Sequence, residues 1–295
     1  MKIESQNGTA DSVKNNKEIK DKKAYRGGSL KAAAAATAVQ ACATPLSLLG
    51  VKGMQNVTKN LSKEQIAQMN EAAEKMIKDT GLSAKGVKIK NLTYLDGGLN
   101  LTGLPDSVLE MKNPYYATAH GKNAAFLPKG IPGVCDANTI IINKEKLPAA
   151  AFHEIGHAFN KNSSKFWSSV QKMRTPAMAA ATLLMLLPAF TKKETAQDGK
   201  ELTKGQKAKN FVRDNSGILA GAAMLPVVSE EIMASVRGCK WANANLPKEL
   251  AKKVKTTNIF GAVSYVGAAI GISLAAFAAT KIKDKAVEKA NNKDS

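Results

Sequence analysis

Apolar and polar residues are distributed unevenly along the chain of 295 residues. The four longest stretches without a charged residue are Ala32–Val51, Thr175–Thr191, Asn215–Ser229 and Thr256–Thr280. The last of them is long enough to cross a bilayer as a helix and has small residues at a helix-packing spacing. We therefore predict a transmembrane helix at 259–280, with a buried helix of a soluble protein as the alternative.

The other charge-free stretches give weaker signals. The segment 30–51 is rich in alanine and contains Gln40 and Pro45, so it is a marginal span. The apolar parts of the two middle stretches, Met178–Phe190 and Ile218–Val228, are short for full spans, and each holds a proline, Pro188 or Pro226. They flank a lysine-rich segment, which predicts an apolar helical hairpin at 176–228. Periodicity does not separate a short membrane hairpin from two buried core helices.

Both ends of the chain are polar. Residues 1–29 are rich in Lys, Asn, Asp and Ser and predict a disordered basic tail. A second basic tail is expected at 281–295. Because the whole of 1–29 precedes the first apolar run, a secretory signal peptide is a poor match.

The segment 52–175 mixes helix and strand periodicities, which predicts an α+β domain. A capping box at Ser62 opens a helix that Gly81 ends. Alternating apolar residues from Val87 to Tyr94 predict a strand with a slip near Asn91, followed by a turn. A short helix is then expected at Pro105–Met111.

The formal net charge is +19, which raises the question of nucleic acid as a partner. The charge is spread over every polar segment, and aromatic residues are only 5% of the chain. No nucleic acid is therefore expected. Lysines beside apolar stretches instead favour the anionic headgroups of a lipid bilayer. The segment 52–174 is itself basic, so the side of the membrane on which it lies stays open.

Candidate chemistry appears in the sequence His153-Glu154-Ile155-Gly156-His157. Four residues advance a helix by slightly more than one turn, so both imidazoles project from one face and can bind one metal ion. Glu154 lies beside them, where a carboxylate can take a proton from a water that the metal activates. This is the H-E-x-x-H motif of zinc peptidases and predicts one Zn²⁺ per chain; a chance occurrence on a charged helix is the alternative.

A catalytic zinc usually takes three protein ligands. The metzincin position for a third histidine holds Ser163, which excludes that class. The segment Ser229-Glu230-Glu231-Ile232-Met233-Ala234-Ser235 resembles the E-x-x-A-D segment of membrane gluzincins, the HtpX-like and CaaX-prenyl-protease-like metallopeptidases. The resemblance implies that Glu231 is the third ligand and that Ser235 stands where the family has an aspartate orienting a ligand histidine. Glu230 is the fallback ligand, and a solvated charge at a helix start is its simpler interpretation.

The resemblance covers residues 120–240 with an interruption, and it includes the strand-like Asn123-Ala124-Ala125-Phe126. It implies a zincin-like metallopeptidase domain at 52–175, with the apolar hairpin inserted before a third-ligand helix at 229–258 and with flanking transmembrane helices. Zincins commonly pair the extended substrate with an edge strand. The residues expected to form that strand are Thr139, Ile140, Ile141 and Ile142, with an ordinary core strand as the alternative.

Tyr116 and His120 lie just before these strands and are candidate donors to an oxyanion. The alternative is that the tyrosine is a core aromatic and the histidine a surface residue.

These observations predict an integral, multi-pass membrane protein that acts as a zinc metalloendopeptidase on a polypeptide substrate. Ser235 supports the alternative of a catalytically inactive metal-binding membrane or interaction protein of zincin fold. Glu154 argues against it, because a purely structural zinc site has no use for a general base. A soluble metallopeptidase with buried alanine-rich helices is a third possibility.

Overall fold

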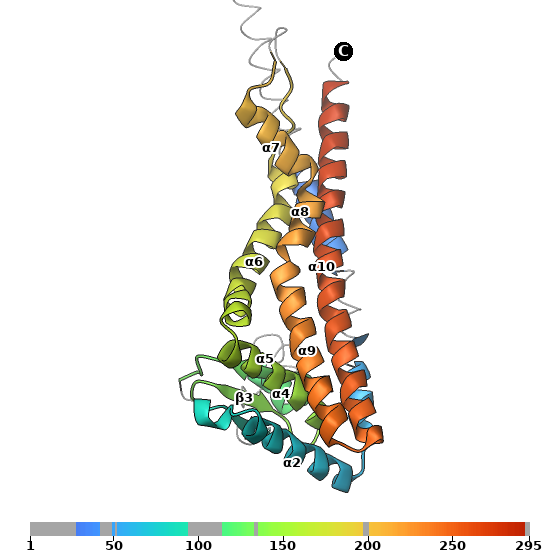
Figure 1. Cartoon of the computed structure of the whole chain (residues 1–295). Helices are drawn as coiled ribbons and strands as arrows, with labels where there is room; N and C mark the ends of the chain where they lie inside the picture. Colours follow the sequence, from blue (N-terminus) through green and yellow to red (C-terminus); the bar gives the residue numbers. More distant parts are fainter. Residues whose placement is uncertain are drawn as a thin grey trace, which may run out of the picture. The chain divides into compact units, whose positions relative to one another are not determined.

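A computed structural model describes residues 28–41, 49–50, 52–93, 114–132, 135–196 and 201–292 (Figure 1). The chain divides into two compact units. The sheet unit comprises Thr44–Ala177 and Leu225–Ala268, and the helical unit comprises Met1–Ala43, Met178–Met224 and Ala269–Ser295. Residues 1–27 of the predicted tail at 1–29, the turn after Tyr94 and the helix at Pro105–Met111 lie outside the described residues. Residues 28 and 29 already belong to a helix, so the tail is shorter at this end than expected.

The sheet unit contains three short strands: β1 (Lys88–Asn91), β2 (Ala124–Leu127) and β3 (Thr139–Ile142). Their order is β1-β3-β2, and β3 pairs parallel with β1 and antiparallel with β2. The expectation that Thr139, Ile140, Ile141 and Ile142 form an edge strand is therefore wrong. β3 is the central strand, every residue in it is buried, and both of its backbone edges are already paired.

The sheet is accompanied by helices, and local sequence signals explain where α2 (Lys63–Asp79) begins and which face it buries. This helix begins at the predicted capping box of Ser62 and Gln65 and buries an apolar face with Met69 and Met76. A 3₁₀ turn at Pro148–Ala150 leads into α5 (Ala151–Ser163). A shorter helix, α4, covers Pro114–Ala119, and a 3₁₀ turn, η1, covers Ser83–Lys85.

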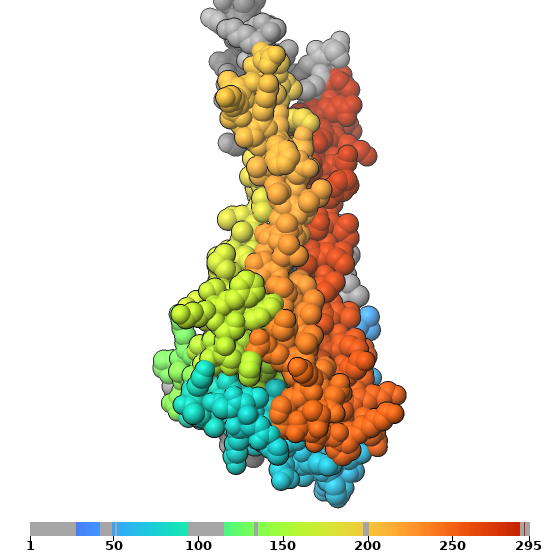
Figure 2. Space-filling view, viewed as in Figure 1, coloured from blue at the N-terminus to red at the C-terminus, as the bar shows by residue number. Residues whose placement is uncertain are grey.

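One apolar core joins these elements to the end of α9 (Leu225–Asn245) and the beginning of α10 (Lys248–Asn291). On the surface of the sheet unit, α2 lies beside the end of α9 (Figures 1 and 2). There the Lys75 ammonium lies 5.7 Å from the centre of the Trp241 ring. The coarse prediction of an α+β protein is confirmed: the described chain is mostly helical, with one small sheet.

The helical unit is formed by alanine-rich contacts. Its buried cluster comprises Ala32, Ala36, Met185, Ala189, Ala220, Ala275, Ala276 and Ala279. These residues belong to the helix at 28–41, the end of α6 (Lys165–Phe190), α8 (Ser216–Ala223) and α10. Small side chains let helix backbones approach closely, as in membrane helix bundles. α7 (Lys204–Asp214) has its own capping box at Thr203 and Gln206.

Three helical segments are long and apolar enough to cross a membrane: Lys165–Phe190, Ser216–Asn245 and Lys248–Lys289. The helical segments that contain the two middle charge-free stretches are thus longer than the sequence suggested, because each continues into polar residues. The expected boundary at 258 is also shifted, since α9 ends at Asn245 and Pro247 precedes α10. Proline has no backbone N–H with which to continue α9 and is well tolerated just before or in the first turn of a new helix. The expected tail at 281–295 is helical as far as Asn291.

α10 carries an exposed apolar stripe at intervals of three or four residues. Its members are Ile259, Val263, Val266, Ile270, Leu274 and Phe277, each at least 39% exposed. Such spacing places them along one face of the helix. An exposed apolar face of this length is compatible with contact to lipid, in agreement with the coarse prediction of a membrane location.

Candidate metal centre

The two histidines of the motif lie together on α5. Their Nε2 atoms are 2.9 Å apart, and the rings stand almost perpendicular at 89°. His157 is buried, whereas the His153 side chain keeps 12% of its surface accessible. One imidazole edge of the pair is therefore open to solvent.

Glu231 on α9 completes a triangle with these histidines. Its Oε2 lies 3.0 Å from Nε2 of His153 and 3.4 Å from Nε2 of His157. Zinc bonds of 2.0–2.2 Å in a tetrahedral arrangement separate the ligand atoms by about 3.3–3.6 Å. One of the three separations falls in this range and two are slightly shorter, so a small outward shift would seat one divalent ion, and the His and Glu groups here could hold a metal.

The environment of Glu230 differs from the one that the sequence suggested. It does not lie solvated at a helix start but within α9, with 0% of its surface exposed. Its Oε1 lies 2.8 Å from Nδ1 of His157 and accepts a hydrogen bond of 3.0 Å from the Asn160 amide. A carboxylate on the far nitrogen of a ligand histidine fixes the ring and makes it a stronger ligand.

These carboxylates also control the proton on His157. Burial by itself would lower the pKa of this imidazole. Its hydrogen bonds to Glu230 and Glu231 outweigh the burial and, with the negative charge of Glu231, raise the pKa to about 10.

Arg174, on α6 within the sheet unit, bridges the two glutamates. Its Nη1 donates to Oε2 of Glu230 at 2.8 Å, and its Nη2 donates to Oε1 of Glu231. The oxygen of Glu231 that faces the histidines is therefore not the one that binds arginine. With Glu154 included, three carboxylates and one guanidinium leave two negative charges when the carboxylates are ionised and His157 is neutral, the form in which it can bind a metal. A divalent cation would balance them.

Ser235 takes the place that the resemblance gives to an aspartate. Its Oγ lies 3.0 Å from Nδ1 of His153, on the ring nitrogen that points away from the metal position. Each histidine therefore has an oxygen partner on its Nδ1 atom, a hydroxyl for His153 and a carboxylate for His157.

Close contact between α5 and α9 depends on two glycines. A Cβ atom on Gly156 would lie 2.2 Å from the carbonyl oxygen of Ala234. One on Gly238 would lie 2.5 Å from the carbonyl oxygen of Phe152. Since such distances are far inside van der Waals contact, only glycine lets the helices approach closely enough for the histidines to reach Glu231.

Glu154 faces β2. It is 7% exposed, and its Oε2 accepts a hydrogen bond of 2.7 Å from the backbone N–H of Phe126. The N–H and C=O of one residue in an antiparallel strand point to the same side. The backbone groups of Phe126 and Ala124 therefore point away from β3. Among the described residues, the edge of the sheet near the motif that pairs with no further strand belongs to β2.

A cavity of about 130 Å³ opens beside Glu154 and His153. Tyr265 lines it, as do Ala124 of β2 and two buried polar residues of α10, Thr257 and Asn258. Within the described part of the chain, Oγ1 of Thr257 and Oδ1 of Asn258 have no hydrogen-bond partner. Asn258 donates its amide to the carbonyl of Ser235 at 3.3 Å, which fixes Oδ1 as a free acceptor.

The expected oxyanion donors do not belong to this cavity wall. Tyr116 is buried, and its ring contacts the His120 ring edge to face with centroids 4.3 Å apart. Tyr265 lines the cavity instead. It was missed because it lies inside an apolar stretch that predicts only a membrane helix.

Comparison with protein-family models, with curated proteins and with solved structures found no match to this chain.

Proposed function

We propose that this chain is a membrane-associated, zinc-dependent endopeptidase of the zincin type, as the resemblance to membrane gluzincins implies. The triangle formed by His153, His157 and Glu231 carries the proposal, because its three ligand atoms lie 2.9–3.4 Å from one another. A general base stands beside this triangle at an accessible cavity, and a purely structural metal site would not need that base.

The three ligands would hold one Zn²⁺ per chain. When bound, zinc supplies Lewis acidity that polarises a peptide carbonyl and makes water a better nucleophile at neutral pH. Glu154 accepts the proton of the attacking water and delivers it to the leaving amine. The Phe126 N–H holds one oxygen of Glu154, which leaves the other for this transfer.

The substrate would lie extended along the free edge of β2. Ala124 presents its N–H and C=O on this side and also lines the cavity, whereas Phe126 presents only its C=O there because its N–H is held by Glu154. A peptide added as a strand would be held by main-chain hydrogen bonds next to Glu154. β2 thus replaces β3 as the proposed substrate strand.

Tyr265 is the proposed donor to the oxyanion that forms on the attacked carbonyl. It lines the cavity beside His153 and Glu154, and a phenol can donate a hydrogen bond there. Three helices that could cross a membrane would restrict the substrates to polypeptides at or near a bilayer.

The first test combines metal analysis and proteolysis on detergent-purified protein. We expect close to one zinc per chain in the wild type and in Glu154→Gln, and a large loss in Glu231→Ala. Casein cleavage should be absent in both variants and retained in Glu74→Gln, which alters an ion pair with Lys144 away from the site. Zinc without cleavage by the wild type would favour a metal-binding protein without peptidase activity. Absence of zinc would refute the proposal.

A further inference from the structure

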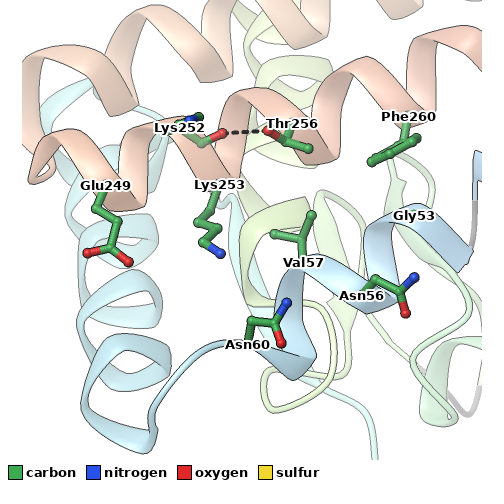
Figure 3. Close-up of a pocket in the computed structure, with 9 residues that line it drawn as sticks. All are labelled: Gly53, Asn56, Val57, Asn60, Glu249, Lys252, Lys253, Thr256 and Phe260. Atoms are coloured by element: carbon green, nitrogen blue, oxygen red, sulfur yellow. Dashed lines mark hydrogen bonds between the residues drawn. The ribbon is translucent and has the colours of Figure 1, made fainter.

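A groove of about 440 Å³ in the sheet unit is not used by the proposed peptidase site (Figure 3). It lies between the helical residues 52–59 and the beginning of α10. Its lining residues are Gly53, Asn56, Val57, Asn60, Glu249, Lys252, Lys253, Thr256 and Phe260.

Close packing limits the groove at its Phe260 end. A Cβ atom on Gly53 would lie 2.6 Å from the Phe260 ring. One on Gly50 would lie 2.8 Å from the carbonyl oxygen of Phe260. Glycine therefore lets the two helices touch here, while toward Asn60 and Lys253 larger side chains hold them apart and leave the space open (Figure 3).

The lining changes from charged to apolar along α10. Glu249, Lys252 and Lys253 precede the charge-free stretch, and Phe260 lies within it. If this helix crosses a bilayer, its charged start lies at headgroup depth and Phe260 enters the hydrocarbon. The groove therefore follows the polarity of a lipid molecule, from headgroup to acyl chain.

Polar groups in the groove are available to a ligand. Asn56, Asn60 and Lys253 come from both sides of it, and in Figure 3 the Lys253 side chain extends toward Asn60. Within the described chain, none of these three side chains makes a hydrogen bond or ion pair. Two lysines and one glutamate give the lining a formal charge of +1. That charge matches a phosphodiester, which carries one negative charge.

We propose that this groove binds the headgroup of an anionic phospholipid. Lys253 and Lys252 pair with the phosphodiester, and the amides of Asn56 and Asn60 donate to its oxygens or to the glycerol. Val57 and Phe260 contact the beginning of an acyl chain. The apolar end distinguishes this site from one for a soluble phosphate compound, which has nothing to place against Phe260.

The test measures lipid binding to the full chain in a neutral detergent, with phosphatidylglycerol, phosphatidylcholine and soluble glycerol 3-phosphate as separate probes. We expect binding of phosphatidylglycerol to be strongest. Lys253→Glu should weaken it about tenfold or more, because the charge near the headgroup is reversed. Lys255→Glu makes the same charge change on an exposed residue outside the groove and should alter binding less than about twofold.

Equal weakening by the two variants would overturn the proposal in favour of diffuse electrostatic attraction. Glycerol 3-phosphate binding as tightly as the lipid would overturn it in favour of a soluble anion site. The melting temperature of each variant without lipid checks the fold. Because the readout involves neither zinc nor proteolysis, it is independent of the proposed peptidase activity.

Discussion

Replacing Glu230 by glutamine tests whether the buried carboxylate behind His157 supports a metal ligand. Glutamine keeps the shape of the side chain and can still accept a hydrogen bond, so the change removes mainly the negative charge. Glu230 is fully buried, lies 2.8 Å from Nδ1 of His157 and also pairs with Arg174. Without the carboxylate, the imidazole becomes a weaker ligand, and the guanidinium keeps only Glu231 as a charged partner.

The expected magnitude follows from this geometry. Loss of such an outer partner typically weakens metal binding 10–100-fold, or about 1.4–2.8 kcal/mol. We expect a value near the upper end, about 100-fold, because burial excludes water as a substitute and the Arg174 charge is left poorly balanced.

A competition titration against a fluorescent zinc chelator, with the protein in detergent, measures the change. Glu74→Gln is the matched control, since it removes a carboxylate paired with Lys144 in the same unit. Circular dichroism establishes that both variants fold. A zinc affinity for Glu230→Gln within about twofold of the wild type would refute the assigned role.

Three further predictions follow from the same site. Gly156→Ala should lower the free energy of unfolding by about 1–3 kcal/mol and reduce zinc binding, because the new methyl group overlaps the Ala234 carbonyl. Urea unfolding measures the loss of stability. The control is Gly205→Ala, which has open space around the added methyl group and should not destabilise the fold. Tyr265→Phe should lower kcat about 100-fold while zinc content and KM stay unchanged. A kcat equal to that of the wild type would exclude Tyr265 as the oxyanion donor. Because His157 has its pKa raised to about 10 in the absence of metal, its proton stabilises the metal-free fold fully below pH 6.5, and this contribution is lost as the pH rises through 10. Zinc must displace that proton, so the zinc Kd should fall about tenfold per pH unit between pH 7 and 8, and a pH-independent Kd would contradict this reasoning.

Local signals in the sequence correctly predicted much of the secondary structure. The capping box at Ser62 and the apolar face of α2 depend on residues close in the chain, and both are present in the structure. The spacing of His153 and His157 likewise determines that they share one helix face. The pairing of these histidines with Glu231 came from resemblance to a family, and the structure brings the three side chains together.

The position of each strand in the sheet was not predicted, because strand order is a long-range property. β3 was expected at an edge and lies in the centre. A signal was present, since an uninterrupted run of Ile140, Ile141 and Ile142 is typical of a strand covered on both faces.

The groups around the candidate metal ligands were also missed, for a related reason. Glu230, Arg174 and Tyr265 come from three different helices, and each looks ordinary in its local sequence. Glu230 resembled a surface charge, and Arg174 stood at the edge of an apolar stretch. Their roles appear only when α5, α6, α9 and α10 are packed together within the sheet unit.

The free edge of β2 has a consequence for what an enzyme of this design could cut. Main-chain hydrogen bonds are the same for nearly every amino acid, so recognition along Ala124 and Phe126 carries little information about sequence. It does require that the incoming segment have unpaired N–H and C=O groups over several residues. Intact helices and the inner strands of sheets have none to offer. Selectivity would therefore fall on conformation, and unfolded or damaged chains would be cleaved while their native forms are spared.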